Sequence, residues 1–318
     1  MAADIQLEQY KKMIKYCGYT GISLDGFSVR QLRNLKQICQ LTTNMPEFRD
    51  IDKNIGALEK LSLDEIRGLS KSFYEKYFNL HDVYSVSLDT MRSKSSEIQN
   101  SDSYEEAKAK VESELTVINP FDLEINLAEG NAMNGRVSEP LALIEGFESD
   151  PSRMVYFSEI KLGSQLNLLS ASTLVHEMAH IQQDSNIGYA EDYNNKELIS
   201  IFLEKVSALE ADPTGELLKM SERCRLRDIM RIYTASSYFN NMLTGVDRID
   251  NLAYLKSFLY AEKLFDMYLN ERKQKNRDKY FYRIQDVFDG KMTVEDLVAQ
   301  KNITVANSQD MGLLKRHI

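Results

Sequence analysis

A His-Glu-Met-Ala-His pentapeptide, from His176 to His180, constrains this chain more than any other segment. Two His four residues apart lie on one face of an α-helix, so His176 and His180 can bind a single zinc ion if this segment is helical. Glu177 is then placed to accept a proton from a water molecule activated by the metal. The chain has only four His, and chance would produce this pattern roughly 0.01 times in such a composition. The motif therefore predicts a zinc-binding helix.

The residues around the motif predict a helix that is buried on most sides. Ser170 to Thr173 is a hydroxyl-rich stretch able to cap free amide groups, and an apolar run continues through the motif to Ile181. The segment from Asp184 to Gly188 contains Asn and Gly, which tolerate the left-handed conformation that ends helices. We therefore expect the helix to end in this segment.

A zinc site for hydrolysis needs a third protein ligand and leaves a fourth position open. A second helix is predicted over residues 197–211, and one narrow stripe of small and polar residues runs along it between apolar walls: Glu197, Ser200, Glu204, Ser207 and Ala211. Glu197 and Glu204 follow His180 by 17 and 24 residues. Either carboxylate could return across a short turn to complete a site with two His and one Glu.

These residues resemble the zincin metalloproteases, in particular the gluzincin branch, whose third ligand is a Glu on a helix after the HExxH helix. Glu197-Leu-Ile-Ser200 resembles the arrangement around the third ligand of thermolysin-like enzymes, and its extension to Glu204 resembles thimet-type oligopeptidases. The resemblance covers about residues 170–213 and assigns the third-ligand role to Glu197 first and to Glu204 second. Two features depart from thermolysin: the linker before Glu197 is slightly shorter, and Ile201 replaces an acidic residue.

The resemblance implies a zinc-dependent endopeptidase with one Zn2+ per chain and a protein or peptide as substrate. Glu177 is the expected general base and acid, which takes a proton from the attacking water and later delivers it to the leaving amine. The oxyanion that develops needs a further hydrogen-bond donor. The candidates near or after the motif are Tyr189, Tyr193, Tyr233, Tyr238, Arg223 and Arg225.

Other classes of zinc site fit the motif less well or stay open as alternatives. The metzincin pattern is excluded, because Gln183 and Asn186 stand where it requires Gly and His. A closed structural zinc site is disfavoured, because the three cysteines lack paired spacing and are expected to be small buried hydrophobic residues: Cys17, Cys39 and Cys224. Two alternatives stay open: a protein-interaction module with a non-catalytic zinc site, and a metal-dependent hydrolase of a non-peptide substrate.

Net charge and hydropathy limit the kinds of binding partner and the cellular locations expected for this protein. The net charge of −9 argues against a protein that binds nucleic acid through its phosphates. No apolar run approaches the roughly 18 residues of a membrane span, and the polar first residues predict no signal peptide. We expect a cytoplasmic protein or one secreted by a non-classical route, and an effector-type protease acting in a host cell fits by analogy alone.

The fold expected is α+β and mostly helical, with three regions. Residues 1–115 form a helical N-terminal region, residues 116–212 a zincin-like core with a small sheet before the metal-binding helix, and residues 213–318 a helical region that completes the cleft. Strands are predicted at 123–127, 141–144 and, most strongly, 154–162. An edge strand of this sheet could hold a substrate backbone by pairing with it.

Helices are predicted from apolar spacing and from end signals. Ser62 and Glu65 fit a capping box that opens a helix reaching Phe78. The other predicted helices cover about residues 6–16, 28–41, 86–98, 104–115, 215–240, 252–272, 278–288 and 293–300.

Overall fold

The computed structural model describes residues 46–86, 109, 116–137, 155–157, 159–186, 193–234, 250–273 and 278–300. The chain divides into two compact units, each built from separate stretches of sequence. The sheet unit comprises Glu59–Asp192 and Asp278–Val294, and the helical unit comprises Met1–Leu58, Tyr193–Arg277 and Glu295–Ile318. The described residues are mostly helical with two small sheets, so the α+β expectation is confirmed. Among them, no helix combines the length and apolar character needed to cross a bilayer.

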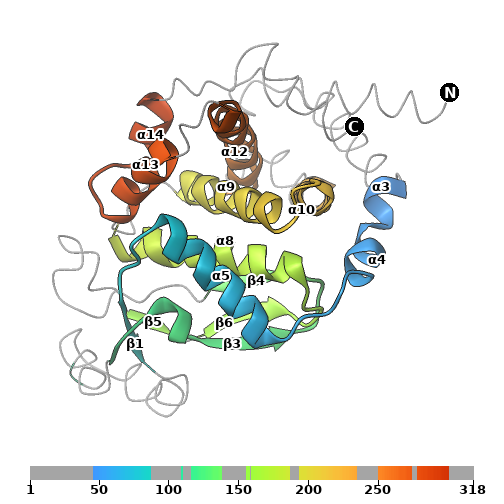
Figure 1. Ribbon diagram of the computed structural model, residues 1–318, viewed down its shortest axis with the longest axis horizontal. Coiled ribbons are helices and arrows are strands. Elements are labelled where there is room, and N and C mark those ends of the chain that lie inside the picture. Colours follow the sequence, from blue (N-terminus) through green and yellow to red (C-terminus); the bar gives the residue numbers. More distant parts are fainter. Residues whose placement is uncertain are drawn as a thin grey trace, which may run out of the picture. The chain divides into compact units, whose positions relative to one another are not determined.

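The helical unit is organised around one central helix. Its helices are α3 (Pro46–Arg49), α4 (Ile51–Gly56), α9 (Tyr193–Ala211), α10 (Glu216–Thr234), α12 (Asp250–Lys273) and α14 (Val294–Gln300), whose first residue belongs to the sheet unit. α9 packs along α12 and against α10, and α10 in turn contacts α4 (Figure 1). Every residue from Leu198 to Ala208 is buried, as expected for a helix that is covered on several sides.

Buried charges connect α9 to both of its neighbours. Lys205, at 1% exposure, contacts Glu222 of α10 with Nζ to Oε1 at 2.5 Å, and also pairs with Glu262 of α12. Burial alone would lower the pKa of Lys205, but the charges and hydrogen bonds of the two carboxylates raise it. Lys205 therefore stays charged and fixes α9 between α10 and α12.

The sheet unit contains two three-stranded sheets. One has the order β2-β1-β5, with strands β1 (Val83–Val86), β2 (Thr116–Ile118) and β5 (Val155–Phe157). The other has the order β3-β6-β4, with strands β3 (Glu124–Ala128), β4 (Gly135–Val137) and β6 (Glu159–Gly163). β3 pairs with β6 in parallel, whereas β4 pairs with β6 in antiparallel orientation. β4 is therefore an edge strand in the described part of this sheet.

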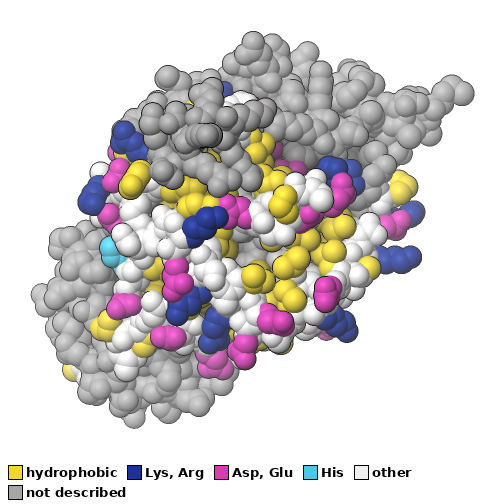
Figure 2. Space-filling view, viewed as in Figure 1, with side chains coloured by type: hydrophobic (Ala, Val, Ile, Leu, Met, Phe, Trp, Pro, Cys, Tyr) yellow, Lys and Arg dark blue, Asp and Glu magenta, His cyan; other side chains and the backbone are white. Residues whose placement is uncertain are grey.

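Helices complete the sheet unit: α5 (Leu63–Tyr77), α8 (Leu168–Asn186), α13 (Asp278–Phe288) and a short 3-10 helix at Pro120–Asp122. α8 packs against α5, α13, β4 and β6 (Figure 1). The predicted capping box of α5 is confirmed, because Ser62 Oγ accepts from the Glu65 amide and Glu65 accepts from the Ser62 amide. On the face shown in Figure 2, acidic and basic side chains of described residues are intermingled.

The strand predictions are partly right. The segment 123–127 is confirmed as β3, but the single strand predicted over 154–162 is wrong, since β5 and β6 belong to different sheets. Tyr156 pairs with Ser85, whereas Ile160 pairs with Ile125. The β-branched and aromatic residues of β5 and the alternating polarity of β6 mark both segments as strand, but these local patterns carry no information about the partner strands. β1 lies in a region expected to be helical. The predictions at 6–16, 28–41 and 141–144 lie outside the described residues, as do that at 86–98 apart from Val86 and that at 104–115 apart from residue 109.

Side-chain hydrogen bonds hold the loop between α5 and β1 to α8 and α13. The amide of His81 donates to Gln182 Oε1 at 2.8 Å, and Gln182 donates back to the His81 carbonyl at 3.0 Å. Gln285 of α13 makes the same two-way contact with the backbone of Asn79. Asp289 lies 2.9 Å from His81 Nε2 and accepts from Gln285 at 2.7 Å. The loop is thus fixed to two helices at once.

Acid is expected to weaken this attachment. Burial alone would raise the pKa of Asp289, but hydrogen bonds from Lys291, Gln285 and His81 lower it to about 2. Because this value lies below the ordinary 3.8, the stabilisation is fully present above about pH 4 and is lost as the pH falls toward about 2. Asp289→Asn is expected to lower the free energy of unfolding at pH 7 by about 1–2 kcal/mol and to flatten its decline over that interval.

Urea unfolding in the presence of EDTA measures both effects without a contribution from metal release. Asp286→Asn is the matched control three residues earlier in the chain, because the contact of Asp286 with Arg283 is long, at 3.9 Å, and partly exposed to solvent. An Asp289→Asn variant with the stability and acid response of the unmodified protein would contradict the role assigned to Asp289.

Candidate metal centre

Helix α8 carries the HExxH motif and is capped at its start by Asn167. Asn167 Oδ1 accepts from the Leu169 amide at 2.9 Å, and Ser170 Oγ accepts from the Asn167 amide at 3.1 Å. The cap therefore lies just before the hydroxyl-rich stretch in which it was expected, and Ser170 only completes it. The helix ends at Asn186, within the predicted segment.

Two side chains of α5 bind the backbone of α8 next to the motif. Ser70 Oγ donates to the Ala171 carbonyl at 2.9 Å, and the Tyr74 hydroxyl donates to the Val175 carbonyl at 2.7 Å. Burial raises the pKa of Tyr74 well above its ordinary value, and the charge of Glu177 raises it further. Tyr74 therefore remains a hydrogen-bond donor, and the two bonds fix the position of α8 along α5.

His176 and His180 bring their ring nitrogens close together. His176 is 3% exposed and His180 is half-buried. Their Nε2 atoms lie 3.1 Å apart, and their rings are nearly perpendicular at 73°. In a tetrahedral site with bonds of 2.0–2.1 Å, two nitrogen ligands of one zinc ion are separated by about 3.3 Å. The His pair thus already has nearly the spacing that a shared metal ion requires.

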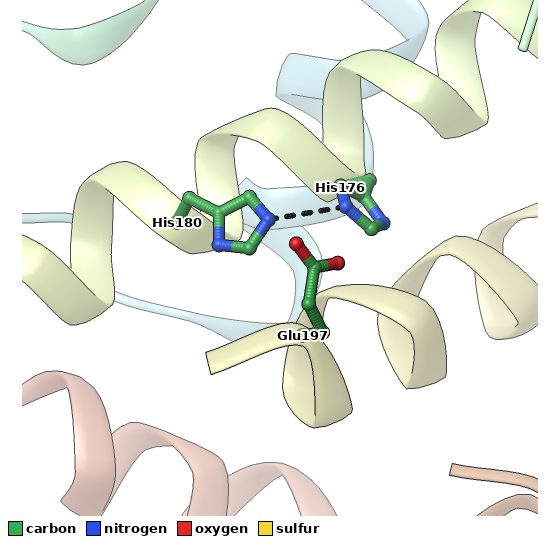
Figure 3. A group of neighbouring side chains, drawn as sticks. All are labelled: His176, His180 and Glu197. Carbon is green, nitrogen blue, oxygen red and sulfur yellow. Dashed lines mark hydrogen bonds between the residues drawn. The ribbon is translucent and has the colours of Figure 1, made fainter. Parts of the chain in front are cut away.

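Glu197, in the first turns of α9, joins the two His in a group that could hold a metal ion (Figure 3). One nitrogen atom from each His and one carboxylate oxygen of Glu197 all lie within 4.8 Å of one another. Glu197 is 7% exposed. A buried set of two imidazoles and one carboxylate fits the donor preferences of zinc and of related transition metals.

Glu204, the other candidate third ligand, is bound elsewhere. Its side chain is fully buried and accepts from Ser221 Oγ at 2.7 Å. Arg225 donates to the same carboxylate from Nη2 at 2.7 Å and from Nε at 3.1 Å. The structure therefore brings Glu197, and not Glu204, into the group with His176 and His180.

Glu177, the predicted general base, is 4% exposed and lies against the edge strand β4. A Cβ atom built on Gly135, the first residue of β4, would be only 2.4 Å from Glu177 Oε1. The carboxylate of Glu177 thus lies directly beside the backbone of this strand. Sequence reasoning missed Gly135, and no local signal identifies it, because 42 residues separate it from Glu177.

The hydrogen-bond donors predicted for the oxyanion stay predictions. Tyr189 and Tyr238 lie outside the described residues. Tyr193 begins α9 and Tyr233 lies near the end of α10, but neither side chain is among those described. Arg223 is half-buried on α10.

Cys224 is the one cysteine within the described residues, and it is buried as expected. Burial raises the pKa of its thiol to about 12, and the charge of Asp228 contributes in the same direction. The thiolate form that binds zinc is therefore strongly disfavoured at this position.

No protein-family model matches this chain, and neither a curated protein nor a solved structure matches it. Its own residues are the basis for assigning a function.

Proposed function

We propose that this protein is a zinc-dependent endopeptidase that hydrolyses a protein or peptide. His176, His180 and Glu197 are the metal ligands in this proposal, and Glu177 is the general base and acid. The observation that carries it is the grouping of two imidazoles and one buried carboxylate within 4.8 Å. Three protein ligands leave one coordination position for a reacting group, which is typical of catalytic rather than structural zinc sites.

The chemistry divides between the metal and one carboxylate. A zinc ion held by these ligands would act as a Lewis acid on a water molecule and on the carbonyl group of the scissile bond. Glu177 accepts a proton from the attacking water at its carboxylate and transfers it to the nitrogen of the leaving amine. A non-catalytic metal site has no need of this residue, so the placement of Glu177 next to His176 supports turnover.

The edge strand β4 supports a peptide as the substrate. One edge of β4 pairs with β6, and β4 ends the sheet in the part of the chain that the structure describes. An extended peptide can add to such an edge through main-chain hydrogen bonds. Because Glu177 lies beside Gly135 of this strand, a peptide held there passes close to the general base. This geometry favours a polypeptide over a small non-peptide substrate.

The proposal is tested with the unmodified protein. Elemental analysis is expected to give one zinc per chain, and mass spectrometry is expected to detect internal cleavage of a mixed peptide library. Chelation should abolish cleavage and added zinc should restore it. Stoichiometric zinc without cleavage of any peptide would support the interaction module instead. Hydrolysis restricted to ester or non-peptide amide substrates would support the other alternative, and a protein that binds no zinc would refute the proposal.

A further inference from the structure

Gly135 occupies a position where an added side chain would collide with two side chains of α8. A Cβ atom built there would lie 2.4 Å from Glu177 Oε1 and 2.6 Å from Thr173 Cγ2. Both distances are far below the normal contact between such atoms. The two side chains come from successive turns of α8, so the strand and the helix approach each other closely at this residue. Any larger residue at this position must therefore displace these side chains.

Backbone conformation gives no alternative reason for this glycine. Among the described residues, the glycines with a positive φ are Gly130, Gly215 and Gly290. Gly135 is not one of them, so an L-amino acid could adopt its backbone angles. It also lies in a strand, where glycine is otherwise unfavourable. A larger residue at this position would instead displace Thr173 and Glu177.

Thr173 is the second side chain of α8 that lies against Gly135. Its hydroxyl donates to the Ala132 carbonyl, at 2.8 Å, in the turn before β4, and it lies 3.0 Å from the Leu169 carbonyl. Its methyl group faces Gly135. Thr173 is fully buried, and rotation about its first side-chain bond would break the contact with Ala132. The turn before β4 is thus attached to α8 one helical turn before the general base.

We propose that Gly135 is a positioning residue for Glu177: its missing side chain provides the space in which the carboxylate lies between β4 and α8. This inference rests on the proposed function, because positioning matters only if Glu177 moves a proton. Glu177 acts on the reacting atoms, whereas Gly135 acts on them only through Glu177. A misplaced carboxylate should therefore slow the chemical step and leave metal binding and substrate binding intact.

The test compares two proteins: the Thr173→Ser variant and the double variant that carries Gly135→Ala as well. Serine keeps the hydroxyl that reaches Ala132 and removes the methyl group, so the collision of the new Cβ with Thr173 Cγ2 is relieved and that with Glu177 remains. In this background Gly135→Ala is expected to lower kcat about 100-fold with little change in KM and with unchanged zinc content. Gly68→Ala is the control, because Gly68 is exposed on α5 and a Cβ there contacts nothing within 4 Å.

A second measurement separates this inference from the proposed function. A crystal structure of the Gly135→Ala, Thr173→Ser protein is expected to show the carboxylate of Glu177 displaced by about 1 Å or more, since its oxygen must leave the new Cβ. A carboxylate in its original position, or an unchanged kcat in a zinc-loaded variant, would overturn the inference. If the unmodified protein cleaves no peptide, the proposed function fails while the displacement still reports whether Gly135 places Glu177.

Discussion

Glu177→Ala is expected to lower kcat for peptide hydrolysis by about 10³- to 10⁴-fold while the protein keeps one zinc per chain. The carboxylate is not among the three grouped ligand atoms, so its loss removes proton transfer and leaves the metal ligands in place. KM should change little, because the carboxylate acts on the proton transferred in the transition state. Single-turnover kinetics and elemental analysis of the same preparation measure the two quantities.

Glu75→Ala provides the control for this substitution. Glu75 is exposed on α5, where it makes a long contact of 3.9 Å with Lys71. Its removal should alter neither kcat nor zinc content. If Glu177→Ala lost zinc together with activity, Glu177 would be part of the metal site rather than the general base. If the variant remained active, the catalytic role of Glu177 would be wrong.

Glu197→Ala and Glu204→Ala are expected to have opposite consequences although they change the same residue type on the same helix. Loss of Glu197 removes one of three ligands and should weaken zinc binding by about 10³-fold. Loss of Glu204 should leave zinc affinity unchanged, because its carboxylate is bound by Ser221 and Arg225. It should instead lower the free energy of unfolding by about 3 kcal/mol, since Arg225 loses its buried partner.

Competition with a chromogenic chelator gives the zinc affinities, and urea unfolding of the metal-free proteins gives the stabilities. The two variants serve as controls for each other. A zinc affinity that falls with Glu204→Ala and not with Glu197→Ala would transfer the ligand role to Glu204. If neither variant changed zinc affinity, the gluzincin-like site would be refuted while the His pair could still bind metal.

Local patterns predicted the helical parts of the site well. The bounds of α13 match the predicted 278–288, and α8 ends within its predicted segment. The capping box at Ser62 was readable because both partners lie within three residues. Apolar spacing and end signals are properties of short windows, and helices are stabilised within such windows. The His pair was visible for the same reason.

Contacts between distant segments could not be predicted from the sequence. Glu197 and Glu204 lie on one stripe of one helix and look equivalent there. They differ because Arg225, 21 residues after Glu204, donates hydrogen bonds to the carboxylate of Glu204. The contact of Gly135 with Glu177 and the separation of β5 from β6 likewise depend on which elements pack together. Hydrophobic periodicity specifies which face of a strand is buried and does not specify its neighbour.

Because of the buried contacts of Lys205, the helical unit should tolerate substitution of Lys205 less well than substitution of either acidic partner. One ammonium group serves two carboxylates, those of Glu222 and Glu262. Loss of either carboxylate still leaves an ion pair with Lys205, whereas loss of the ammonium removes the cation that both carboxylates share. During divergence, a lysine at this position should therefore outlast each of its acidic partners, and its replacement should require both acids to change first.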